Sequence, residues 1–207
     1  MEKVIIFLCR GVVNTINSMF SFIYCLPISN TIIILISICC LWEFLNSKVK
    51  SEKINVWKTF NFILFIMWMI CIVYMTIFTR GTEVDETNLM PFHSIVDVIN
   101  GDNIELLRGS WMNCLLFVPG SMWLKYSMLK PNWKKSIWQI AFFLFMSICI
   151  EATQGYLNLG VVEVDDVIYN TIGAVIGFTA HAWSKRLICF IMSMLLKIKN
   201  IIKKKEN

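Results

Sequence analysis

The sequence is short of charge: only 16% of its 207 residues are Asp, Glu, Lys or Arg, whereas 57% are hydrophobic. A typical soluble domain has about 25% charged residues. The mean hydropathy of +0.65 also lies outside the usual soluble range. This composition excludes an ordinary soluble domain and indicates an integral membrane protein. The net charge of +5 does not indicate a nucleic-acid-binding protein, because the basic residues form short clusters between apolar runs.

Motifs of metal binding and catalysis are missing as well. The chain contains 8 cysteines but no C-x-x-C pair, and they lie in or beside apolar runs, where cysteine acts as a small apolar residue. No H-E-x-x-H motif, P-loop, or Ser or Cys nucleophile beside a base is present. The segment Leu26-Pro27-Ile28 lacks the small residues of a signal-peptide cleavage site. We therefore expect no metal, no cofactor and no disulfide framework.

Long apolar runs predict membrane-spanning helices. Four clear runs occupy residues 28–45, 60–79, 136–157 and about 167–183. At 1.5 Å per residue, 20 residues cover about 30 Å, the thickness of the hydrocarbon core. A fifth run, 111–129, is interrupted by Pro119-Gly120, and we expect a kinked span there rather than a re-entrant hairpin.

The segment 4–26 is less apolar than these runs because it contains Arg10, Asn14 and Asn17. It is expected to form either a sixth span or a helix in the membrane interface. The predicted fold is therefore an all-α polytopic transmembrane bundle of five or six helices, with one helix kinked at Pro119-Gly120.

Loop charges predict the orientation of the spans. Lysines cluster in residues 46–58 and 125–135, and basic residues follow Lys185, so these parts are expected to face the cytoplasm. The loops 80–110 and 158–166 are mainly acidic and are expected on the opposite side.

On this pattern the chain has three parts. They are N-terminal membrane segments with a cytoplasmic loop (1–58), a transmembrane domain (59–184) and a basic tail (185–207). The tail is apolar with lysines at its end, so we expect it to lie along the inner leaflet.

The predicted topology brings polar side chains from four helices to one membrane depth, on the extracytoplasmic side. Polar groups at that depth are costly and are functional candidates by default. We therefore predict a single ligand-binding site there, formed by Arg80, Asn113, Glu151, Gln154, Asp165, Asp166 and Asn170.

The final span also has a packing stripe. Asp166, Asn170, Gly173, Gly177 and His181 recur at spacings of four, three, four and four, so they share one helix face. Gly173-x-x-x-Gly177 predicts close packing against another helix. His181 lies away from the polar cluster and is expected to pack or snorkel.

Each candidate residue also has a structural alternative. Glu151 and Gln154 can bind a ligand, with Glu151 as an acid or base, or they can hydrogen-bond to Asn113 or Asn170. Asp165 and Asp166 can bind a ligand or cap a helix.

Three further alternatives concern the surroundings of this cluster. Arg80 can meet a carboxylate or a phosphate. A divalent-cation site using Asp165, Asp166, Glu163 and Glu151 is chemically possible, but no fixed ligand spacing supports it. His93 lies in an apolar periodic segment, 92–107, which is expected to form an amphipathic helix on the outer face or a lid over the site, with His93 as an interfacial residue.

Four short motifs carry a family resemblance. They are Asn88-Leu89-x-Pro91-Phe92, Asn113-x-x-x-Phe117-x-Pro119-Gly120, Glu151-x-x-Gln154 and Asp165-Asp166-x-x-x-Asn170-x-x-Gly173. In this order and spacing, over roughly residues 60–183, the chain resembles the VanZ family. The resemblance implies a small multi-helical protein of a bacterial cytoplasmic membrane that is associated with resistance to teicoplanin-type glycopeptide antibiotics.

This resemblance implies a role at the outer face of the membrane, with a lipid-linked cell-wall precursor or a glycopeptide as the partner. One departure stands out: many members have an arginine before the acidic pair, where this chain has Gly160-Val161-Val162-Glu163. Two alternative functions remain. One is an enzyme acting on a lipid-linked envelope substrate through Glu151 or Asp166, and the other is an accessory subunit of another membrane protein.

Overall fold

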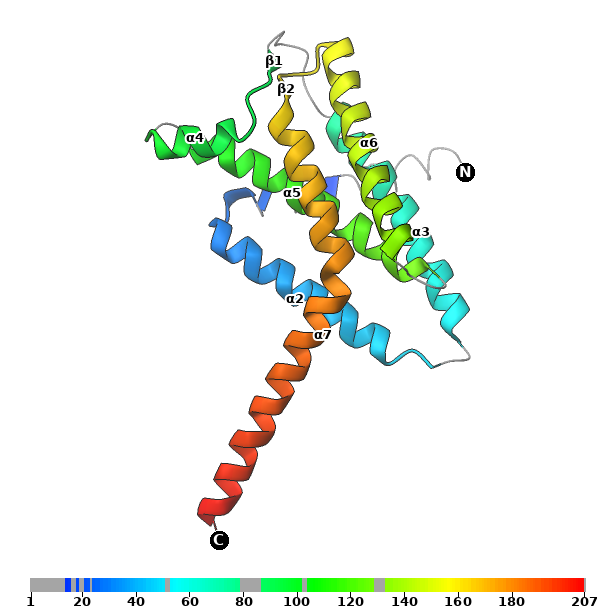
Figure 1. The fold of residues 1–207 in the computed structure, drawn as a ribbon, viewed down its shortest axis with the longest axis vertical. Helices are drawn as coiled ribbons and strands as arrows, with labels where there is room; N and C mark the ends of the chain where they lie inside the picture. Colours follow the sequence, from blue (N-terminus) through cyan, green and yellow to red (C-terminus); the bar gives the residue numbers. More distant parts are fainter. Residues whose placement is uncertain are drawn as a thin grey trace.

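The protein is an all-α bundle with almost no strand (Figure 1). The computed structural model describes residues 14–15, 18, 21–22, 24–50, 53–78, 87–101, 104–128 and 133–206. The α-helices among these residues are α2 (Ile28–Ser47), α3 (Ile54–Val73), α4 (His93–Ile99), α5 (Ile104–Ser127), α6 (Trp133–Leu157) and α7 (Val164–Glu206). A π-helical turn, η2 (Tyr74–Phe78), extends α3, and strands β1 (Thr87–Asn88) and β2 (Val162–Glu163) pair in parallel.

Three helical segments are long and apolar enough to span a membrane: Ile28–Ser47, Ile54–Phe78 and Ser136–Leu157. They are α2, α3 with its π-helical turn, and most of α6. Large apolar side chains such as Ile33, Ile70 and Phe145 are exposed on their outer surfaces, as expected for helices in contact with lipid. The prediction of an all-α polytopic bundle is confirmed.

Helices α5 and α7 form the most extensive helix contact in the bundle. A Cβ atom added at Gly173 would overlap the carbonyl oxygen of Cys114, and one added at Gly177 would overlap that of Val118. The backbones of α5 and α7 are therefore close enough that only glycine fits at these two positions. Gly173 and Gly177 of the predicted stripe therefore face α5.

Pro119 lies inside α5, which is one helix from Ile104 to Ser127 and not a hairpin. Proline has no N–H to donate to the carbonyl four residues earlier, which is that of Leu115. The next carbonyl oxygen, that of Leu116, accepts from Nε1 of Trp68 of α3 at 2.8 Å. A side chain of a neighbouring helix thus binds the backbone of the turn before Pro119.

Aromatic and aliphatic side chains from four helices form the core. Phe65 and Ile72 of α3, Phe117 of α5 and Phe143 of α6 are buried together with Ala174 of α7. Ala174 has a small side chain and is fully buried in this core.

Two predicted boundaries differ from the structure. The segment 92–107 is not one helix: α4 ends at Ile99 and α5 begins at Ile104. Gly101 between them has a φ of +84°, in the left-handed region that stops a helix.

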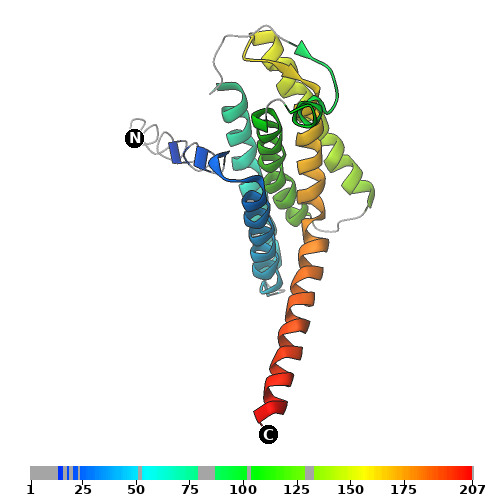
Figure 2. The same cartoon turned by 90° about the vertical axis from the view of Figure 1, so that its left-hand side faces the viewer.

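The helix that contains the predicted span 167–183 is longer than that span, because α7 continues to Glu206 as a 43-residue helix that projects from the bundle (Figure 2). No glycine or proline follows Gly177, so nothing in the local sequence ends the helix at residue 184. At 1.5 Å per residue its length is about 65 Å. Most of the segment 4–26 lies outside the described residues, so the choice between a sixth span and an interfacial helix stays a prediction.

Candidate functional site

Asp165, the second residue of α7, joins two helices. Its side chain is only 2% exposed. The carboxylate accepts hydrogen bonds from the backbone N–H of Phe92, from the backbone N–H of Ser94 at 3.0 Å and from Ser94 Oγ at 2.7 Å. These donors lie at the N-terminus of α4, where helix N–H groups have no partner within the helix. Asp165 therefore caps α4 from a different helix, a role that its sequence position did not suggest.

Phe92, the residue before α4, has a φ of 58°, which is uncommon for a side chain of this size. Its N–H is one of the donors to Asp165. The carboxylate thus binds the backbone at the point where the chain makes an unfavourable turn, and Asp165 anchors α4 to the start of α7.

Glu151 and Gln154 lie on one face of α6 and contact different neighbours. Glu151 Oε2 accepts from the backbone N–H of Glu163 in β2 at 3.2 Å. Gln154 is fully buried, and its Nε2 donates to the carbonyl oxygen of Thr76 at 2.8 Å. Thr76 lies in the π-helical turn that extends α3. Gln154 therefore ties α6 to α3, and Glu151 ties α6 to β2.

Asn170 contacts α6 through Ser147, because its Nδ2 lies 2.8 Å from Ser147 Oγ. The structural alternative for Glu151 and Gln154 had paired them with Asn113 or Asn170. Within the described part of the chain, the buried Oδ1 of Asn170 has no hydrogen-bond partner.

A pocket of about 430 Å³ brings two of the predicted residues together. Asn113 of α5 and Asp166 of α7 both line it, and Ser110, Glu105 and Glu163 supply its other polar groups. We call it the Asp166 pocket; its remaining lining residues are Leu106, Gly109, Met112 and Val161. Since Glu163 lines the pocket and its N–H binds Glu151, the Glu151 carboxylate is connected to the pocket wall through β2.

A second pocket, of about 400 Å³, lies next to the first and shares Met112 and Asn113 with it. We call it the Tyr24 pocket; its other lining residues are Ser21, Tyr24, Cys25, Met75, Thr76 and Leu116. Tyr24 also contacts the wall of the Asp166 pocket, because its hydroxyl donates to Glu105 Oε2 at 2.9 Å. The sequence did not predict that the N-terminal segment reaches this part of the bundle.

The structure thus separates the predicted site residues into groups. Asn113 and Asp166 line one pocket, and Glu151 accepts a hydrogen bond from the backbone of Glu163 in the wall of that pocket. Asp165, Gln154 and Asn170 have contacts that join helices. Arg80 lies outside the described residues, so its predicted role is untested. In the described ranges, no three His, Cys, Asp or Glu side chains are arranged to hold a metal ion.

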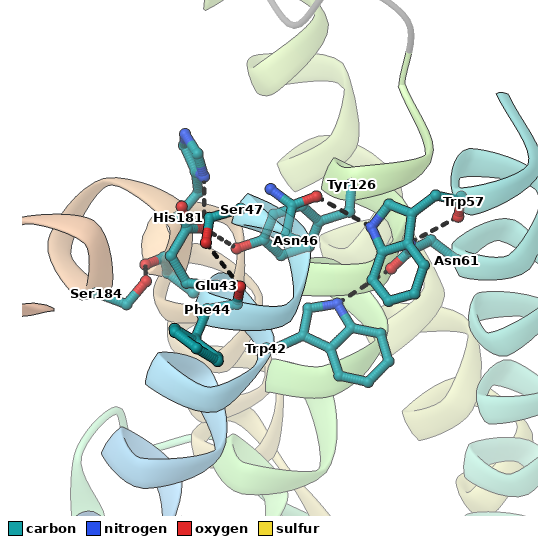
Figure 3. Close-up of polar contacts among 11 residues, drawn as sticks. Trp42, Glu43, Phe44, Asn46, Ser47, Trp57, Asn61, Tyr126, His181 and Ser184 are labelled. Carbon is teal, nitrogen blue, oxygen red and sulfur yellow. Dashed lines mark hydrogen bonds and ion pairs between the residues drawn. The ribbon is translucent and has the colours of Figure 1, made fainter. Parts of the chain in front are cut away.

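A second polar cluster, around Glu43 of α2, was not predicted from the sequence (Figure 3). Glu43 is 5% exposed, and its Oε2 accepts from the Tyr126 hydroxyl at 2.6 Å. Nδ1 of His181 lies 2.7 Å from the same oxygen. His181 therefore pairs with a buried carboxylate, where the sequence suggested only packing or snorkelling. The available signal was that Glu43 is the one charged residue in the apolar run 28–45, where a charge is costly.

Comparison with protein families identifies the core of this bundle. A family model described as VanZ/LLP1 matches residues 60–189, more than half of the chain. The chain belongs to the VanZ/LLP1 family. The VanZ/LLP1 match confirms the resemblance found in the sequence. It includes every residue predicted for the site, whereas α2 and Glu43 precede it. No match to this VanZ/LLP1 chain was found among curated proteins or among solved structures.

Proposed function

We propose that this VanZ/LLP1 family protein contributes to resistance to teicoplanin-type glycopeptide antibiotics through the Asp166 pocket. One observation carries the proposal: Asn113 and Asp166, which come from different helices of the matched family region, line the same pocket. A pocket with a few convergent polar groups is the default candidate for a ligand site.

The predicted topology supports a position on the extracytoplasmic side. The Asp166 pocket lies at the N-terminus of α7, beside the acidic segment 158–166, whereas the lysine clusters lie at the other ends of the helices. A glycopeptide antibiotic acts on the cell wall and need not cross the membrane. A site at the outer face of the bacterial cytoplasmic membrane therefore fits this function.

The chemistry of the lining restricts the ligand. The described lining has carboxylates from Glu105, Glu163 and Asp166, an amide from Asn113 and a hydroxyl from Ser110, and it has no basic side chain. Carboxylates accept hydrogen bonds from amine and hydroxyl groups. Lipid-linked cell-wall precursors and glycopeptides both carry such groups, and we expect one of them to be the partner.

Teicoplanin susceptibility tests this function directly. Expression of the protein in a sensitive host is expected to raise the minimum inhibitory concentration of teicoplanin, and deletion of the gene is expected to lower it in the native host. If neither change occurs, the proposed function is wrong.

Single substitutions then test the pocket. Asp166→Asn removes a charge from the lining with little change in shape, so resistance is expected to fall while the amount of protein in the membrane stays constant. Asp97→Asn is the matched control, because Asp97 lies on α4, outside the pocket lining, and pairs with His93 at 3.0 Å. Equal resistance for both variants would exclude an essential Asp166 charge. Full activity of Glu151→Gln would exclude acid or base catalysis by Glu151, the step that the enzyme alternative needs.

A further inference from the structure

One face of α2 is buried against the family core, although α2 itself precedes the matched region. The buried residues of α2 are Thr31, Cys39 and Glu43. Leu35 packs into the same cluster as Cys39, so the contact face recurs every four residues. The other faces of α2 are largely exposed and apolar. Because they are similar to one another, contact with lipid does not favour one rotation of the helix about its axis. The contact face must therefore determine where α2 sits.

Glu43 makes the most specific contact on this face (Figure 3). One carboxylate oxygen meets the Tyr126 hydroxyl of α5 at 2.6 Å and Nδ1 of His181 of α7 at 2.7 Å. Because the two partners come from different helices, the contact specifies both the rotation and the axial register of α2. A sliding or rotated α2 would leave a buried carboxylate without partners, which is strongly destabilising.

Polar contacts also join α2 to the bundle elsewhere. Trp111 Nε1 of α5 donates to Thr31 Oγ1 at 2.8 Å, near the N-terminus of α2. Trp42 Nε1, next to Glu43, donates to Asn61 Oδ1 of α3 at 3.2 Å. With Glu43 near one end and Thr31 near the other, α2 is held along its length.

The residues just before α2 form part of a pocket wall. Pro27 precedes the first helical residue, and Tyr24 and Cys25 line the Tyr24 pocket. Tyr24 also donates to Glu105, which lines the Asp166 pocket. A displacement of α2 along its axis would therefore move the wall that these residues form.

We propose that Glu43 is a positioning residue: by binding Tyr126 and His181 it holds α2 in the register that places Tyr24 and Cys25 on the pocket wall. The N-terminal segment, outside the matched family region, then completes the space beside Asn113. The functional consequence rests on the proposed function, because the segment would determine which ligands reach the Asp166 pocket.

Chemical cross-linking in membranes tests this positioning. Cys25 and Met112 line the same pocket, so in a Met112→Cys variant a short bis-maleimide reagent should join Cys25 to position 112. A protease site inserted between Lys50 and Lys53 then shows whether the two halves stay linked on a gel. In the Cys25→Ser background linking should be lost, which assigns the product to Cys25.

Glu43→Leu is expected to slow linking by roughly ten-fold or more, because two interhelical hydrogen bonds are lost. Glu43→Gln should retain most of the linking, since its amide oxygen can still accept from both partners. Asn30→Leu is the matched control, a polar-to-apolar change at an exposed position of α2, and should have no effect. Linking in Glu43→Leu at the unsubstituted rate, or an equal loss in Asn30→Leu, would overturn the proposal.

Two milder variants decide the question if Glu43→Leu fails to accumulate. Tyr126→Phe and His181→Gln each alter one contact, and each should slow linking by roughly three-fold. Unchanged linking in both would overturn the proposal. Linking is measured on the chain itself, so its outcome is independent of teicoplanin susceptibility: loss of the resistance phenotype bears on the proposed function and not on the position of α2.

Discussion

Gly177→Ala is expected to lower the free energy of unfolding by about 1–3 kcal/mol or more, since 1–3 kcal/mol is the usual cost of overpacking a well-packed interior. The new Cβ would overlap the Val118 carbonyl oxygen and the Ser121 hydroxyl, and a backbone carbonyl cannot turn aside as a flexible side chain can. Helix α5 would have to move away along its contact with α7. Gly173→Ala should behave in the same way, because its Cβ would overlap the Cys114 carbonyl oxygen. Thermal unfolding of the purified protein in detergent measures the loss.

Gly109→Ala is the matched control for these two variants. Gly109 lies in α5, like the residues that contact Gly173 and Gly177, but a Cβ there meets nothing within 4 Å. The same substitution should therefore stabilise the protein by roughly 0.5–1 kcal/mol, since alanine favours the helix more than glycine does. A loss of stability in Gly177→Ala together with a gain in Gly109→Ala would indicate a close helix contact. A loss in both variants would indicate a general intolerance of these helices to alanine. Equal stability of Gly177→Ala and the unsubstituted protein would contradict the close approach.

Asp165→Ala is expected to destabilise the region around α4 by about 3 kcal/mol or more. The buried N–H and hydroxyl of Ser94 and the partly buried N–H of Phe92 would lose their acceptor, at roughly 1–3 kcal/mol for each buried unsatisfied group. Hydrogen exchange measures the result, and amides of residues 93–99 should lose protection first.

Asp97→Ala provides the comparison on α4 itself. Asp97 forms an ion pair with His93, and both side chains are 23% exposed, so its loss should cost less than about 1 kcal/mol. A different result would reassign Asp165: if Asp165→Ala keeps its membrane abundance and α4 protection but loses resistance, the carboxylate acts on a ligand.

Much of the fold could be predicted from hydropathy. The runs 28–45, 60–79 and 136–157 became helices α2, α3 and α6, because length and apolar composition are local properties. The α7 stripe was likewise visible, since helical spacing alone places Gly173 and Gly177 on one face. The length of α7 did not follow from hydropathy, because a change from apolar to lysine-rich sequence does not interrupt backbone hydrogen bonds, and no helix-stopping residue follows Gly177.

The candidate site was predicted less completely. The predicted topology brought Asn113 and Asp166 to one depth, and in the structure both residues line one pocket. Topology could not show that Asp165 faces α4 or that Gln154 reaches the carbonyl of Thr76. Adjacent residues of a helix point in different directions, so Asp165 and Asp166 have different neighbours although their depth is almost the same.

The sequence by itself determined that this protein is a helical membrane protein of the VanZ/LLP1 family. It also determined the position of each polar residue along its helix. Only the tertiary structure decided which of these residues pair. Glu43 shows the difference best: its cost inside an apolar helix was evident from the sequence, but its partners Tyr126 and His181 lie 83 and 138 residues away. Position along a helix follows from residue number, whereas the choice of partner depends on how each helix is rotated against its neighbours.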